Sequence, residues 1–285
     1  MANRFLIIDG YSEAGRDNIR AAGMSLGSTL YARMLTRWLP GAEYVVWMPS
    51  EDPNPPEGKG PGEYLAVLWT GSNLNVYHRE DPAVARQIEF SARTYEAGTP
   101  AFGSCWGLQV AVTAAGGEVS LNPRGREIGF ARDIQLTAEG RNHPMLEGKP
   151  SVFDNFSSHL DEATKVPGGA VVLAGNAYSK VQAIEIRHAR GTFWGVQYHP
   201  EYDLHEMACL LTARAGNLLQ EGFFRHSEEL TRYVEKLEAL DREPDRKDLR
   251  RQLDVEDDLL SVECRQQEFR NWIHKIVLPR AAGGA

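Results

Sequence analysis

Residues 100–109 read Pro-Ala-Phe-Gly-Ser-Cys-Trp-Gly-Leu-Gln, and this stretch decides the fold. A short apolar run typical of a buried strand leads into Gly103-Ser104-Cys105-Trp106-Gly107, and a helical pattern follows. The flanking glycines permit a tight strand-to-helix turn that raises one side chain above the sheet, as in a nucleophile elbow. A helix N-terminus favours the thiolate of Cys105, and its N–H groups suit an oxyanion. A free cysteine is more often a buried core residue, so the elbow alone leaves both interpretations open.

Short apolar runs alternate with longer amphipathic segments on both sides of this elbow. The alternation predicts an α/β fold, a doubly wound and mainly parallel sheet with helices on both faces. Such sheets bind ligands at the C-terminal ends of their strands. The expected strands are 5–8, 45–48, 65–69 and 99–102, the expected helices are 30–39, 82–97 and 108–115, and hairpin-forming strands follow at 169–173, 181–187 and 191–196.

A second stretch, Gly195-Val196-Gln197-Tyr198-His199-Pro200-Glu201, places a histidine and a carboxylate two residues apart after an apolar strand. In an extended segment, residues i and i+2 lie on the same side. His199 can then face a thiol while Glu201 orients the imidazole and stabilises its protonated form. Either residue alone at a strand end would be common. The pair, however, supports a catalytic role for Cys105 in the elbow.

Composition excludes several classes of protein. The chain has 285 residues, a net charge of −8, 42% hydrophobic and 25% charged residues, close to the average for soluble globular proteins. No apolar run approaches the ~20 residues that a membrane-spanning helix needs. The acidic balance argues against nucleic acid as the main partner. Three cysteines without metal-type spacing (Cys105, Cys209 and Cys264) predict a reducing, cytoplasmic location.

Charge density divides the chain near residue 225. Residues 226–285 hold 14 acidic and 11 basic residues, and no glycine lies between Gly222 and Gly283. We therefore expect a globular domain over 1–225 and a charged helical C-terminal extension over 226–285, with two or three amphipathic helices. These helices could also pair copies of the chain in a homo-oligomer. Residues 248–260 resemble a helix-turn-helix, but the net negative charge favours packing over DNA binding.

The two stretches together resemble the class I, triad-type glutamine amidotransferases, and most of all the glutaminase domain of GMP synthetases, over roughly residues 4–210. Thr70-Gly71-Ser72, Glu127-Ile128-Gly129 and Ser158-His159-Leu160-Asp161 agree with the family's pattern. The resemblance implies a flavodoxin-like fold and the following roles. Cys105 is the nucleophile, His199 the general base and acid, and Glu201 the orienting carboxylate. The N–H groups of Gly71 and Trp106 form the oxyanion hole, and Gln109 with Ser158, Leu160 and Asp161 holds the amino-acid end of glutamine.

Three departures from the family's pattern stand out. Gly-Gly-Pro is usual where this chain has Thr70-Gly71-Ser72, and Leu160 replaces a glycine. The segment Gly10–Gly27 is longer than the usual turn after the first strand. We expect it to be a loop that covers the pocket and selects what the γ-carboxamide carries, with Arg16 or Arg20 facing an anionic group. A solvated loop, or an extra turn of the following helix, is the alternative.

The sequence gives little support for an α/β-hydrolase, a phosphate-binding loop or a metal site. The α/β-hydrolases share the elbow, but there the acid precedes the histidine, whereas here His199 precedes Glu201. We find no phosphate loop and no metal cluster, so neither a metal nor an organic cofactor is expected. His78 and His205 have no neighbour at ligand spacing and are expected to be surface residues.

The implied reaction is release of ammonia from the γ-carboxamide of glutamine through a cysteinyl γ-glutamyl thioester. The 60 or so residues beyond the glutaminase domain are too few for an ATP-using synthetase. A separate synthetase chain would then accept the ammonia. The first alternative is a free-standing γ-glutamyl hydrolase acting on a substituted γ-glutamyl amide, and the second is a catalytically silent binding or regulatory relative.

Overall fold

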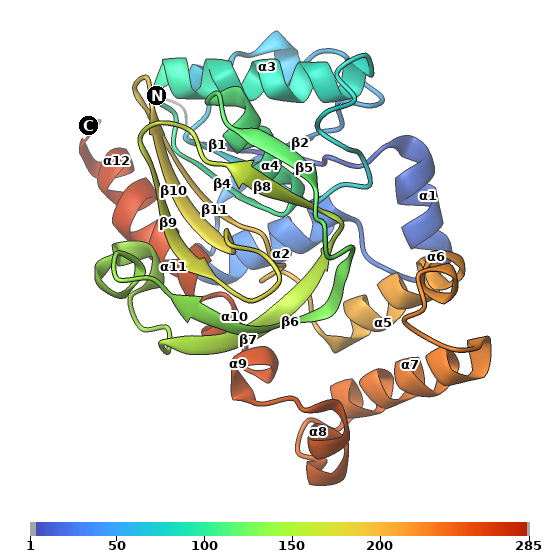
Figure 1. Cartoon of the computed structure of the whole chain (residues 1–285). Coiled ribbons are helices and arrows are strands. Elements are labelled where there is room, and N and C mark those ends of the chain that lie inside the picture. The colour runs from blue at the N-terminus through green and yellow to red at the C-terminus, as the bar shows by residue number, and fades with distance from the viewer. Residues whose placement is uncertain (1–3, 284–285) are drawn as a thin grey trace.

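The structure is a computed structural model that describes residues 4–283, and a nine-stranded sheet forms its centre (Figure 1). The strand order is β2-β1-β3-β4-β11-β10-β9-β6-β7. Neighbours pair in parallel from β2 to β11 and antiparallel from β11 to β7. The predicted α/β fold with a parallel centre is confirmed. The strands are β1 Arg4–Ile8, β2 Glu43–Trp47, β3 Ala66–Trp69, β4 Ala101–Ser104, β6 Glu127–Leu136, β7 Val152–His159, β9 Ala170–Gly175, β10 Ala183–His188 and β11 Gly191–Val196, and β5 Glu118–Leu121 pairs with β8 Asp161–Lys165 in a separate small sheet.

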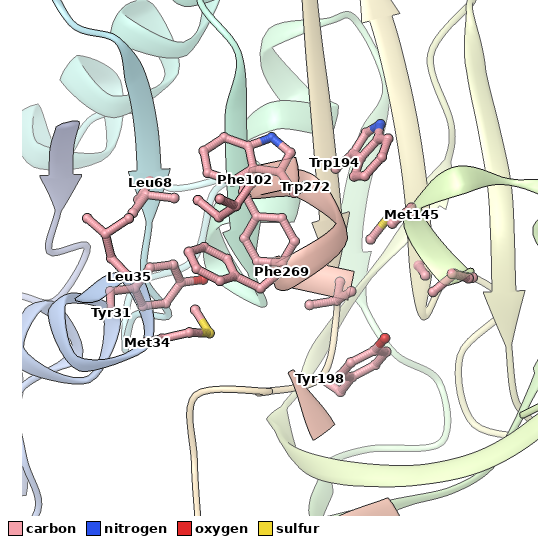
Figure 2. Packing of buried hydrophobic residues seen from close by; sticks show 14 of the residues in the cluster. Tyr31, Met34, Leu35, Leu68, Phe102, Met145, Trp194, Tyr198, Phe269 and Trp272 are labelled. Atoms are coloured by element: carbon pink, nitrogen blue, oxygen red, sulfur yellow. The ribbon is translucent and has the colours of Figure 1, made fainter. Parts of the chain in front are cut away.

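Both faces of the sheet are covered, because successive side chains of a strand point to opposite faces. Ile7 enters one apolar cluster and Ile8 the other. Figure 2 shows the first face, where Phe102 of β4 packs against Phe269 and Trp272 from the C-terminal region. The helices α2 (Gly27–Trp38) and α11 (Gln267–Trp272) cover this face, and α3 (Pro82–Ala97) and α4 (Trp106–Ala114) cover the other.

The region after residue 225 is helical, but it contains more and shorter helices than the two or three expected. Pro244 cannot continue α7, and Asp254 takes a left-handed conformation (φ 53°) that ends α8. In Figure 1, α7 lies at the periphery beside α5 and α8 lies beyond α7, while α11 and α12 return to the sheet. The helices are α5 Leu204–Ala213, α6 Ala215–Gln220, α7 Ser227–Arg242, α8 Lys247–Leu253, α9 Asp257–Leu260, α10 Val262–Arg265 and α12 Leu278–Gly283, with a π-helical turn over Ile273–Val277 and 3₁₀ turns at Pro56–Gly58, Pro61–Glu63, Gly140–Asn142 and Pro144–Leu146. Within residues 4–283, no helix is both long and apolar enough to cross a membrane.

The segment Gly10–Gly27 is not a loop, because it contains the helix α1 (Glu13–Ala21). The Ser12 hydroxyl accepts a hydrogen bond from the N–H of Gly15 at 3.1 Å and so caps the helix. A Cβ on Gly15 would lie 2.2 Å from Oδ1 of Asn73, so this glycine serves close packing rather than a turn. A glycine inside a capped nine-residue helix made the segment look irregular in sequence.

Candidate active site

Cys105 lies at the predicted turn between β4 and α4. Its backbone has φ 49° and ψ −100°, a conformation that costs about 1–3 kcal/mol in a non-glycine residue. The N–H of Cys105 donates to the carbonyl oxygen of Val196 at 2.8 Å, which ties the turn to β11. A Cβ on Gly107 would lie 2.6 Å from Cβ of Trp69, so α4 can approach β3 only with glycine there. The elbow therefore presents the thiol at the C-terminal edge of the parallel strands.

The sheet brings His199 and Glu201 beside the elbow, because they follow β11 and β11 pairs with β4. Nδ1 of His199 lies 2.7 Å from Oε1 of Glu201. The Ser104 hydroxyl donates to the same carboxylate oxygen at 2.9 Å and accepts from the Tyr31 hydroxyl at 2.8 Å. The Tyr202 ring stacks on the imidazole with a centroid separation of 4.1 Å. The imidazole is thus fixed both in its plane and across its face.

The protonation of His199 follows from these contacts. Nε2 of His199 is buried and has no hydrogen-bond partner in the described part of the chain, so it is free to exchange a proton with a reacting group. The Cys105 thiol donates to the carbonyl oxygen of Ser158 at 3.7 Å. Burial by itself lowers the pKa of His199, but the negative charge of Glu201 and the interaction with Cys105 outweigh burial and raise this pKa to about 9. The imidazole is therefore protonated at neutral pH.

This raised pKa predicts a pH dependence for a reaction in which His199 acts as the general acid. A general acid must hold its proton until the leaving group departs, so the first turnover should slow as pH rises through about 9. Glu201→Gln should shift the midpoint downward, because the carboxylate raises the pKa of His199. Rapid-quench measurement of the first turnover from pH 7 to 10 checks both results. A rate that keeps rising to pH 10 would show that His199 does not act as the acid.

Gly71 and Trp106 lie where the resemblance places an oxyanion hole. Gly71 follows β3 and Trp106 opens α4, so both meet Cys105 at the same edge of the sheet. Within residues 4–283, neither N–H donates to a backbone carbonyl. A Cβ on Gly71 would lie 2.8 Å from Cε1 of His199. Position 71 therefore requires glycine for the imidazole to occupy its place.

Gly71→Ala should accordingly reduce activity by about 100-fold, because the contact with Glu201 holds the imidazole in place and displacement of a catalytic group by about 1 Å has an effect of this size. The thermal unfolding midpoint and kcat/KM measured side by side check this result. Gly62→Ala is the matched control, since a Cβ there would meet only Cβ of Ala97 at 3.5 Å. Wild-type activity in Gly71→Ala would show that the imidazole tolerates displacement.

The four residues assigned to substrate binding meet at one cavity of about 460 Å³, which Cys105 also lines. This volume lies in the range of small-molecule sites. Nε2 of Gln109 donates to the carbonyl oxygen of Asp161 at 3.2 Å. The Asp161 carboxylate accepts from Nδ2 of Asn75 at 2.7 Å and from the Tyr77 hydroxyl at 3.3 Å. Sequence analysis did not identify Asn75 and Tyr77 as partners of Asp161, because they precede α3 and lie far from Asp161 in the chain. The cavity-lining members of the assigned set are Gln109, Ser158, Leu160 and Asp161.

The cavity is also lined by the segment that leads into α1, by α1 itself and by the junction of α5 and α6. Tyr11, Asn18, Arg214 and Asn217 contribute to this lining, and none of them belonged to a motif. The expectation that Arg16 or Arg20 would face an anionic group of the substrate is wrong, because neither residue lines the cavity. Arg16 is buried and donates to the Tyr11 carbonyl, Ser50 and Glu51, while Arg20 is exposed and donates to Asp17 at 2.8 Å.

The C-terminal helices contact the loop that carries His199. Nε2 of Gln266, between α10 and α11, donates to the carbonyl oxygen of Pro200 at 3.3 Å, and Oε1 of Gln266 accepts from the Trp38 indole at 2.9 Å. Beneath Tyr198, the buried Lys149 and Glu268 form an ion pair at 3.0 Å. The extension therefore contacts the backbone directly after His199 through Gln266 and supplies Glu268 to the ion pair near the Tyr198 ring.

His205 has neighbours that its sequence surroundings did not reveal. Its Nδ1 lies 2.8 Å from Oε1 of Glu238 on α7, and its Nε2 lies 3.6 Å from Sγ of Cys209, one turn further along α5. The expectation that His205 lacks a neighbour at ligand spacing is therefore wrong, although its side chain is exposed as predicted. Burial and the nearby carboxylates raise the pKa of the Cys209 thiol to about 11. Cys209 is thus a poor nucleophile at neutral pH.

Comparisons with known proteins agree with this geometry. Residues 75–214 match the family model described as glutamine amidotransferase class-I. The chain is 37% identical to the γ-glutamyl-L-1-hydroxyisopropylamide hydrolase of a Pseudomonas species, over 98% of this chain and 94% of that protein.

Two further likenesses are more distant or cover less of the chain. GMP synthase [glutamine-hydrolyzing] of Thermosipho africanus is 35% identical over 48% of this chain, and the match spans 24% of the synthase. The crystal structure of a glutamine amidotransferase from Thermotoga maritima superposes with a TM-score of 0.69 at 16% identity, covering 98% of this chain and 99% of that one. This last likeness concerns the fold alone.

Proposed function

This chain belongs to the class I glutamine amidotransferase family, and we propose that it is a free-standing hydrolase of substituted γ-glutamyl amides with Cys105 as nucleophile. The 37% identity that extends over 98% of the chain to a γ-glutamyl hydroxyisopropylamide hydrolase carries the proposal. The lining of the cavity supports it, because α1 and the α5–α6 junction add residues beyond those assigned to the amino-acid end. These residues offer contacts to a group attached to the amide nitrogen.

The proposed reaction proceeds in two steps. The Cys105 thiolate attacks the γ-carbonyl carbon, and the N–H groups of Gly71 and Trp106 stabilise the oxyanion. His199 transfers its proton to the amide nitrogen, the C–N bond breaks and the amine departs. The γ-glutamyl group is then held on Cys105 as a thioester.

In the second step water replaces the amine. His199 is now neutral and accepts a proton from the water, whose oxygen attacks the thioester carbon. Glutamate departs, and the proton on His199 and the thiolate of Cys105 are restored. Loss of the thiolate charge on acylation lowers the pKa of His199, because the interaction with Cys105 helps to raise that pKa in the free enzyme. The same imidazole can therefore serve as acid first and as base second.

A glutaminase subunit that supplies ammonia to a separate synthetase is the second candidate, favoured by the 35% identity to a GMP synthase. The two proposals differ in what they require. A free-standing hydrolase should act without a partner and prefer substituted amides, whereas a subunit should prefer glutamine and gain activity from its synthetase.

Release of amine from glutamine and from the γ-glutamyl amide of 2-aminopropan-1-ol distinguishes the two candidates. We expect the purified chain to hydrolyse the substituted amide with the higher kcat/KM, and Cys105→Ala to be inactive on both substrates. Cys209→Ala is the matched control and should keep wild-type rates, because that thiol has a raised pKa and does not line the cavity. A clear preference for glutamine would favour the amidotransferase subunit.

A further inference from the structure

Two groups of residues line the cavity besides Cys105. The first group is Gln109 and the segment 158–161, which are assigned to the amino-acid end of the substrate. The second group is Tyr11 and Asn18 near α1 and Arg214 at the α5–α6 junction. A substrate whose γ-carbonyl carbon sits at the thiol must direct its glutamyl part to one side and its amine part to the other.

Two arginines line this cavity, and their surroundings differ. Arg126 forms two parallel hydrogen bonds with the carboxylate of Glu221, at 2.8 and 2.9 Å, so its charge is already balanced. Arg214 is half-buried, and within residues 4–283 its guanidinium makes no ion pair and donates no hydrogen bond. A guanidinium carries five N–H donors, so Arg214 faces the cavity with its hydrogen-bonding capacity unused.

The location of Arg214 indicates which part of the substrate it contacts. His199 must reach the nitrogen of the departing amine, so the amine part leaves on the side of the imidazole. Tyr202 stacks on that imidazole, and Tyr11 lines the cavity. Burial raises the pKa of both tyrosines, and the positive charge of Arg214 opposes the rise in each. Tyr11 and Tyr202 belong to one buried cluster, and Arg214 lines the cavity with Tyr11, so Arg214 lies near the tyrosine that stacks on the imidazole.

We propose that Arg214, with Tyr11 and Asn18, forms a subsite that binds an oxygen acceptor on the amine part of the substrate. This inference rests on the proposed hydrolase function and specifies its substrate class: γ-glutamyl amides whose amine carries a carboxylate or a hydroxyl close to the nitrogen. A guanidinium binds a carboxylate through two parallel hydrogen bonds and a hydroxyl through one. The carboxylate-bearing substrates should therefore gain most from Arg214.

The test uses a matched set of substrates that differ only in the amine: γ-glutamyl-alanine, the γ-glutamyl amide of 2-aminopropan-1-ol, γ-glutamyl isopropylamide and glutamine. First-turnover thioester formation on Cys105 is measured for each, because deacylation is common to all four. In Arg214→Gln we expect a 10- to 100-fold loss for the carboxylate substrate, the size expected for a lost charge-assisted hydrogen bond. We expect a smaller loss for the hydroxyl substrate, and unchanged rates for isopropylamide and glutamine.

Two controls accompany this variant. Arg20→Gln removes the same charge from α1 outside the cavity and should leave the substrate preference unchanged. Arg214→Lys keeps the charge without the planar fork and should restore part of the rate for the carboxylate substrate.

Three outcomes would overturn the inference in distinguishable ways. An equal loss for all four substrates would place Arg214 on the common γ-glutamyl part. An unchanged preference in Arg214→Gln would remove the arginine from recognition altogether. Absence of a thioester from every substrate in the wild-type chain would reject the proposed function itself, and the subsite with it.

Discussion

Cys105→Ala is expected to abolish hydrolysis of γ-glutamyl amides, with a fall in kcat of about 10⁶-fold, the effect of removing the nucleophile from an enzyme that works through an acyl intermediate. The thiol is the one nucleophile that the elbow presents to the cavity and to His199. His199→Ala should be about as damaging, because the two groups act as a unit and the loss of either leaves the same residual activity. Amine release followed over hours, with the double variant beside both single ones, checks this result.

The structure also requires that these losses arise without unfolding. Removing the thiol group leaves the backbone N–H of residue 105 bonded to Val196, so the elbow should persist in Cys105→Ala. Its thermal unfolding midpoint should stay within a few degrees of the wild-type value. A Cys105→Ala variant that is folded and retains more than about 1% of the activity would contradict the assignment of the nucleophile.

Glu201→Gln is expected to reduce kcat by about 10²- to 10⁴-fold while leaving measurable turnover. The carboxylate holds Nδ1 of His199 at 2.7 Å and stabilises the protonated imidazole, and a neutral amide cannot supply that charge. Oε1 of Glu201 also accepts from Ser104, so the side chain should stay in place after substitution. Steady-state kinetics together with the pH profile of the first turnover separate the loss of charge from a loss of position.

A matched control exists elsewhere in the chain. Glu238→Gln removes a carboxylate from His205 in a similar contact at 2.8 Å, but outside the cavity, and should leave kcat unchanged. If Glu201→Gln behaved like the control, Glu201 would have no orienting role.

The sequence predicts those features whose determining residues lie close together along the chain. The elbow was predictable because Gly103 and Gly107 flank Cys105 within one turn, and each is required by close backbone packing. His199 and Glu201 were predictable as a pair from their spacing after an apolar strand, although the expected extended segment is a turn, in which the N–H of Tyr202 donates to the carbonyl oxygen of His199 at 3.3 Å. The parallel strands were predictable because helices must separate them along the chain.

The rest depended on contacts between distant segments. Arg214 and Tyr11 meet at the cavity only because α1 and α5 pack together, and no motif contains either residue. Arg16 looked free to bind an anion, yet tertiary packing turns it toward Ser50 and Glu51. The extension 226–285 was expected to pack against the domain, but its sequence does not indicate where, and Gln266 contacts the backbone between His199 and Glu201. Burial of a polar residue among distant partners leaves no local pattern in the sequence.

The measurement that tests the central proposal most directly is mass-spectrometric mapping of the enzyme quenched in acid during turnover of a γ-glutamyl amide. We expect one γ-glutamyl group, attached to the peptide that contains Cys105, sensitive to hydroxylamine and absent from Cys105→Ala. It should form from the substituted amide faster than from glutamine and without any partner protein. Turnover without an adduct under single-turnover conditions, or an adduct on Cys209 or Cys264, would contradict the assignment of Cys105 as the nucleophile of a γ-glutamyl amide hydrolase.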